Sequence, residues 1–149
     1  MSNRKKSDEL TIFYWTIGIT YILGILSTIS YTKRYKILGA FFVIIIAVIL
    51  ISVSGLRLDG GDTYFYKHSY RLLVEDPNSV DLSKDGLFNI LSLILINFST
   101  DPQILIFTTA LITNLCNVLI LNKYRSYVEL QIYMYITSGY YFVSMNGIR

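Results

Sequence analysis

A short polar stretch at residues 56–71, LRLDGGDTYFYKHSYR, holds side chains that could take part in chemistry. A carboxylate such as that of Asp62 could accept the proton of a hydroxyl group. The guanidinium of Arg57 could bind a phosphate or a carboxylate through two parallel hydrogen bonds. Tyrosines close to these charges add hydroxyl groups and apolar ring faces. The stretch therefore predicts a site for a sugar or a phosphate.

The same residues also have a purely structural interpretation. Asp62 could cap the helix that follows it, while Gly60 and Gly61 let the chain turn. In such a helix, Asp62 would share a face with Tyr66 and with Ser69 or Tyr70. The local pattern alone leaves both interpretations open.

Other chemistries find little support in the sequence. Asp59 and Asp62 are too few ligands for a metal pair, and His68 is the only histidine. We expect His68 to be a solvated residue, although an imidazole also suits a general base. The sequence contains no phosphate-binding loop, nucleophile elbow or CxxC pair. We therefore expect no metal and no cofactor.

Membrane helices must position this stretch, because long uncharged windows surround it. A helix needs about 20 mostly apolar residues to cross a bilayer. The windows of sufficient length are 10–32, 37–56, 102–122 and 130–148. A fifth window, 86–100, has only 15 residues and is predicted to be a re-entrant or interfacial helix. The predicted fold class is all-α, a multi-span integral membrane protein with four transmembrane helices in a single domain, 1–149.

Two short connections between these windows are purely basic. They carry Lys33, Arg34 and Lys36 in one case, and Lys123 and Arg125 in the other. If 86–100 does not cross, both connections lie on one face, which the positive-inside rule makes cytoplasmic. The connection 57–85, with six acids against four bases, then lies outside, as does the amino terminus. If 86–100 does cross, the carboxyl-terminal half inverts.

The third window has two further features. Asp101 followed by Pro102 predicts the start of a helix, with an acidic N-cap and a proline at the first helical position. Asn114 and Asn117 lie in the middle of the window, where we expect interhelical hydrogen bonds. None of the four long windows contains an ionisable group at its centre, which weighs against a transporter.

Taken together with the end of the chain, MNGIR, this stretch resembles the EpsG family of bacterial exopolysaccharide and capsule polymerases. These are multi-span membrane proteins similar in role to the Wzy polymerases. In the family, two apolar spans precede an arginine and a Gly-Thr-Asp-Tyr-x-x-Tyr type segment, and an Asn-x-Ile-Arg-Gln segment follows later. The matching positions here are Arg57, Gly60, Asp62 and Tyr66, and then Asn146, Ile148 and Arg149. Gly61 and Thr63 depart from the family's threonine and first tyrosine, so the resemblance implies no role for them.

The resemblance implies a reaction at the outer face of the bacterial cytoplasmic membrane, with this protein as a multi-pass component. Oligosaccharide repeat units carried on undecaprenyl diphosphate would be joined there. By resemblance, Asp62 orients or deprotonates the acceptor hydroxyl, while Arg57 and Arg149 bind diphosphate or a sugar carboxylate. The implied substrate-binding residues are Gly60, Asn146 and Tyr66, the last lining the sugar pocket. Implied partners are the lipid-linked oligosaccharide, the bilayer and other polysaccharide assembly proteins, and no nucleic acid.

The resemblance covers nearly all of this chain but only the amino-terminal part of a family member, so we expect a fragment that lacks a complete active site.

Two other functions stay open. One alternative is a C-type glycosyltransferase that uses a polyprenyl-phosphate sugar, although its catalytic acid usually follows the first span. The other is a non-catalytic membrane subunit of a polysaccharide assembly or transport system.

Overall fold

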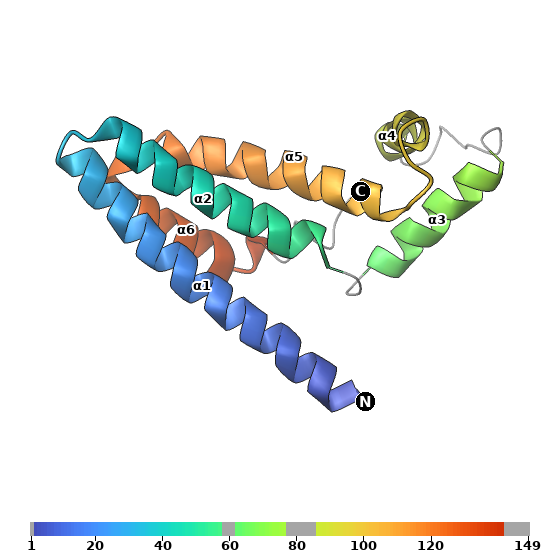
Figure 1. Ribbon diagram of the computed structural model, residues 1–149, viewed down its shortest axis with the longest axis horizontal. Helices are drawn as coiled ribbons and strands as arrows, with labels where there is room; N and C mark the ends of the chain where they lie inside the picture. Colours follow the sequence, from blue (N-terminus) through green and yellow to red (C-terminus); the bar gives the residue numbers. More distant parts are fainter. Residues whose placement is uncertain (1, 58–61, 77–85, 142–149) are drawn as a thin grey trace. The chain divides into compact units, whose positions relative to one another are not determined.

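The computed structural model describes residues 2–57, 62–76 and 86–141, with side chains from residue 11 onwards (Figure 1). Every regular element in these ranges is a helix, which confirms the predicted all-α fold class. The elements are α1 (Ser2–Thr32), α2 (Lys36–Gly55), α3 (Thr63–Glu75), α4 (Gly86–Ile96), α5 (Gln103–Asn122), the 3-10 turn η2 (Arg125–Tyr127) and α6 (Val128–Thr137).

Three of the helices are long and apolar enough to cross a membrane. They cover Thr11–Thr32, Lys36–Gly55 and Gln103–Asn122, within about a residue of the first three predicted windows. The short apolar helix α4 has 11 residues. Its length is about 16 Å at about 1.5 Å per residue, roughly half of the hydrocarbon core. The predicted short apolar helix is therefore present, and it is too short to span.

The fourth predicted window, 130–148, is described only in part. Helix α6 covers its beginning and ends at Thr137. Gly139 follows with a φ of +84°, a left-handed conformation that glycine adopts without steric cost. Residues 142–149 lie outside the described ranges, so a fourth span stays a prediction.

By its contacts, the chain divides into two compact units. Unit 1 comprises Met1–Val53 and Asn114–Tyr141, and unit 2 comprises Ser54–Thr113 and Phe142–Arg149. Helices α2 and α5 both continue across the division. Whether the chain acts as the single domain predicted above stays a prediction.

In unit 1, α1 packs closely against α6 (Figure 1). A Cβ added to Gly24 would lie 2.7 Å from the Cα of Glu129, so only glycine allows this approach. One turn further along α1, the Thr28 hydroxyl donates to the Glu129 carboxylate and accepts from the backbone N–H of Val128 at 3.2 Å. Thr28 thus caps the start of α6 from a neighbouring helix, and small residues allow the close packing.

Buried and half-buried polar side chains join the helices of unit 1. The Tyr135 hydroxyl accepts a hydrogen bond from Asn117 at 2.9 Å and donates one to Asn114 at 3.3 Å. This confirms the expected interhelical hydrogen bonds of the two asparagines. The Tyr141 hydroxyl donates to the carbonyl oxygen of Leu50 at 2.9 Å.

Hydrogen bonds between side chains and helix ends show which helix ends are neighbours within each unit. In unit 1, the Tyr31 hydroxyl donates to Asn122 at 3.0 Å, which joins the end of α1 to the end of α5. In unit 2, Gln103 donates to the carbonyl oxygen of Gly55 at 2.7 Å, which joins the end of α2 to the start of α5. The connection between α2 and α5 therefore starts and ends at the same end of these helices. This is the arrangement expected if the window 86–100 does not cross.

Candidate functional site

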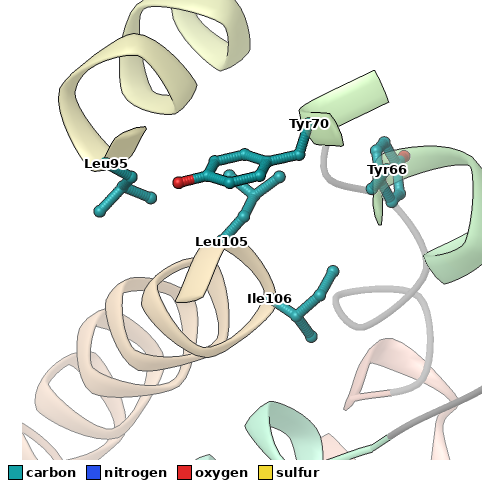
Figure 2. Packing of buried hydrophobic residues seen from close by; sticks show 5 residues of the cluster. All are labelled: Tyr66, Tyr70, Leu95, Leu105 and Ile106. Carbon is teal, nitrogen blue, oxygen red and sulfur yellow. The ribbon is translucent and has the colours of Figure 1, made fainter. Parts of the chain in front are cut away.

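Helix α3 is amphipathic and carries the candidate site at its start. Its buried residues, Thr63, Tyr66, Tyr70 and Leu73, recur at three- and four-residue spacing. Tyr66 and Tyr70 join an apolar cluster of unit 2 with Leu95, Leu105 and Ile106 (Figure 2). The predicted shared face is wrong in part, because Asp62 and Ser69 are exposed whereas Tyr66 and Tyr70 are buried.

Tyr70 fixes α3 to the turn between α4 and α5. Its side chain is fully buried, and its hydroxyl donates a hydrogen bond of 2.7 Å to the carbonyl oxygen of Ser99. Figure 2 shows its ring beside Leu105, with the hydroxyl end pointing toward Leu95. Burial, and secondly the nearby Asp101 carboxylate, raise the pKa of the Tyr70 phenol above its ordinary value. The phenol therefore stays a neutral donor.

Tyr66, predicted to line a sugar pocket, lies within the same cluster. Its side chain is 8% exposed, and its ring centroid lies 5.4 Å from that of Phe88. The ring thus holds α3 against α4. A direct contact between Tyr66 and a sugar stays a prediction.

Asp62 occupies the N-cap position of α3, but its carboxylate does not cap the helix. The side chain makes no capping hydrogen bond and is exposed. Asp101 offers a direct comparison, because its carboxylate accepts a hydrogen bond of 2.9 Å from the backbone N–H of Gln103. The predicted cap is therefore confirmed at Asp101, whereas the capping interpretation of Asp62, one of the two left open, is wrong. The Asp62 carboxylate lies at the positive end of the α3 dipole and is accessible to a ligand.

Arg57 follows the last turn of α2 and is half-buried. The side-chain amide of Gln103 donates to the carbonyl oxygens of Gly55 at 2.7 Å and of Arg57 at 3.2 Å. Carbonyl groups at a helix end lack partners within the helix, and Gln103 supplies one from α5. The sequence pattern did not single out Gln103, whose only signal was its place just after the Asp101-Pro102 helix start.

Aromatic rings on the exposed side of α3 come directly after Asp62. Tyr64 is 70% exposed and Phe65 is 64% exposed. The imidazole of His68 stacks on the Tyr64 ring, with centroids 6.2 Å apart and planes at 6°. His68 is exposed as expected, although it lies in a helix. These rings offer exposed, flat apolar faces two and three residues after Asp62 in the sequence, whereas the sequence pattern had favoured Tyr66.

The other predicted site residues, Gly60, Asn146 and Arg149, lie outside the described ranges. Of the predicted set, the structure brings Arg57, Asp62 and Tyr66 into unit 2. Within the described ranges, no three His, Cys, Asp or Glu side chains lie together in a way that could hold a metal ion.

Three helices long and apolar enough to cross a bilayer, in an all-helical chain, are the features of a helical membrane protein. The family model of the EpsG family matches residues 40–149. The chain therefore belongs to the EpsG family, as its motifs predicted, and this membership points to a polysaccharide polymerase-like role. Comparisons with curated proteins and with solved structures found no match.

Proposed function

We propose that this chain acts in joining undecaprenyl-diphosphate-linked oligosaccharide repeat units at the outer face of the bacterial cytoplasmic membrane. The observation that carries the proposal is the exposed carboxylate of Asp62, which does not serve as a helix cap. Because no capping bond occupies it, this carboxylate is available to a substrate hydroxyl. Membership of the EpsG family supports a glycan as that substrate.

In the proposed reaction, an acceptor hydroxyl oxygen of one repeat unit bonds to the anomeric carbon of the growing glycan. The bond from that carbon to the lipid diphosphate breaks, and the diphosphate leaves with the electron pair. Asp62 orients the hydroxyl and takes its proton. Arg57 and Arg149 stabilise the negative charge of the departing diphosphate.

The contacts of unit 2 support positioning roles for several residues in this proposal. Gln103 holds the backbone of Arg57, while Tyr66 and Tyr70 hold α3, which begins directly after Asp62. Tyr66 is thus a positioning residue in addition to its predicted place near the sugar. We assign sugar stacking to the exposed rings of Tyr64 and Phe65.

Gly60 and Asn146 complete the proposed substrate-binding set. Their assignment rests on their match to the family motifs, Gly60 between Arg57 and Asp62 and Asn146 three residues before Arg149.

The proposed orientation follows from the helix ends. The basic connections after α1 and after α5 meet through Tyr31 and Asn122, so both lie on one face. The positive-inside rule makes that face cytoplasmic. In the orientation that the charges of the connections predict, the connection 57–85, with Arg57 and Asp62, faces outward, where lipid-linked repeat units are joined.

Deletion of the gene in its source bacterium tests this function. Glycan chain length is measured on gels, and lipid-linked repeat units are measured by mass spectrometry. We expect complete single repeat units to accumulate and the ladder of longer chains to disappear. An unchanged ladder would contradict the proposal, and repeat units that lack one sugar would indicate the C-type glycosyltransferase instead.

A further inference from the structure

An open pocket of about 750 Å³ lies at the elbow between α1 and α2. Its lining residues are consecutive or nearly so: Arg34, Tyr35, Lys36, Ile37, Leu38 and Phe41. The lining changes from cationic at the elbow to apolar along the first turns of α2. Ile37 is 90% exposed and Phe41 is 54% exposed, so the apolar side is open to a ligand.

Backbone hydrogen bonds fix the turn that carries this pocket, so the pocket is formed without a ligand. The N–H of Tyr35 donates to the carbonyl oxygen of Ser30 at 2.9 Å, and the N–H of Arg34 donates to that of Tyr31 at 3.1 Å. These two bonds form a Schellman motif at the end of α1. The elbow is thus a defined turn that fixes the directions of the side chains on it.

Arg34 occupies the left-handed position of this motif, with a φ of 68°. Glycine adopts this conformation freely, whereas a residue with a Cβ is strained there. A long cationic side chain at a strained backbone position is a reason to look for a function of that side chain.

Further cations lie at the same end of unit 1. The Arg125 guanidinium lies 5.3 Å from the centroid of the Tyr31 ring, and Tyr31 also binds Asn122. Glu129 is the only acid among the side chains described for unit 1, and Thr28 donates a hydrogen bond to it. This end of unit 1 therefore has a strong excess of positive charge, carried by Lys33, Arg34, Lys36, Lys123 and Arg125.

We propose that the elbow pocket binds an anionic phospholipid of the bilayer. The phosphate lies between Arg34 and Lys36, and an acyl chain follows Ile37, Leu38 and Phe41 along α2. Basic pockets at the ends of membrane helices recognise anionic head groups. A free phosphate would satisfy the two cations but would leave the apolar side of the pocket uncovered. The proposal does not depend on the proposed polymerase function.

Native mass spectrometry of the full chain, purified in detergent, tests this proposal. Phosphatidylglycerol and phosphatidylcholine with the same acyl chains are titrated separately. We expect phosphatidylglycerol to bind at least about tenfold more tightly, because two cations at this site face its uncompensated charge. Equal binding of the two lipids would overturn the proposal. So would displacement of phosphatidylglycerol by excess inorganic phosphate, which would indicate a site for a soluble anion.

Variants locate the site. Arg34→Gly combined with Lys36→Gln removes both cations and leaves the turn relaxed, since glycine suits the φ of Arg34. Lys67→Gln combined with Arg71→Gln removes the same charge from α3 and serves as the control. We expect the elbow variant to lose the preference for phosphatidylglycerol and the α3 variant to keep it. Equal losses in both variants would overturn the assignment to the elbow pocket.

Discussion

The hydroxyl of Tyr70 donates a hydrogen bond of 2.7 Å to the carbonyl oxygen of Ser99. This bond joins α3 to the turn between α4 and α5. In the sequence, α3 ends at Glu75 and α4 begins only at Gly86. Because α3 begins directly after Asp62, the bond also contributes to the position of the proposed catalytic carboxylate.

Replacing Tyr70 with phenylalanine removes this bond and leaves the Ser99 carbonyl without that donor. We expect a loss of about 0.5–1.5 kcal/mol in the free energy of unfolding. Thermal unfolding in detergent measures this as a lower midpoint. As a control, Tyr64→Phe removes a hydroxyl from a side chain that is 70% exposed, and this variant should leave the midpoint unchanged. Equal midpoints for the two variants would contradict the assigned role of Tyr70.

The same bond predicts a pH dependence. The pKa of Tyr70 is raised above its ordinary value of 10.0, so the folded protein keeps the phenol proton where the unfolded chain loses it. The contribution of the protonated Tyr70 phenol to stability is full below about pH 10 and is lost as the pH rises through the raised pKa. The difference in midpoint between wild type and Tyr70→Phe should be constant up to about pH 10 and shrink above it. A difference that shrinks at neutral pH would contradict this.

Gly24 should tolerate no side chain. A Cβ there would meet the Glu129 Cα at 2.7 Å, and backbone cannot move aside cheaply. We expect Gly24→Ala to destabilise the packing of α1 on α6 by about 1–3 kcal/mol. Gly18→Ala is the matched control, because no atom lies within 4 Å of its added Cβ. It should be neutral or slightly stabilising, as alanine favours helix, and a neutral Gly24→Ala would argue against the close approach.

The two aspartates before helices should differ in their effect on stability. Asp101→Ala removes the hydrogen bond to the Gln103 N–H and should cost about 1 kcal/mol. Asp62→Ala removes no capping bond and should cost much less. Thermal midpoints of the two variants in the same detergent measure the difference. If Asp62→Ala costs as much as Asp101→Ala, then Asp62 is a cap after all.

Much of the fold could be predicted from the sequence because membrane helices are defined by length and apolarity. The apolar parts of α1, α2 and α5 match the first three windows within about a residue, although α1 itself begins earlier, at Ser2. Asp101 with Pro102 marked the start of α5. A short apolar run could only form a short helix, as α4 shows. The break at Gly139 escaped prediction, because an uncharged run gives no sign that one glycine adopts a positive φ.

The candidate site was predictable in its residue types but not in its geometry. The spacing of Asp62 and Tyr66 suggested one shared face, whereas burial against α4 and α5 turned Tyr66 inward and left Asp62 exposed. That outcome depends on contacts with helices distant in the sequence. The role of Gln103 escaped for the same reason, since its partners at Gly55 and Arg57 lie about 50 residues earlier.

The central claim is that the Asp62 carboxylate serves chemistry and not helix capping. The most direct test compares Asp62→Asn with Asp101→Asn, each restored to a strain in which the gene is deleted, with glycan chain length as the readout. Asparagine retains the ability to cap a helix, so both variants should insert and fold. We expect Asp62→Asn to give single repeat units without longer chains and Asp101→Asn to restore the full ladder. Long chains made by Asp62→Asn at wild-type levels would contradict the claim.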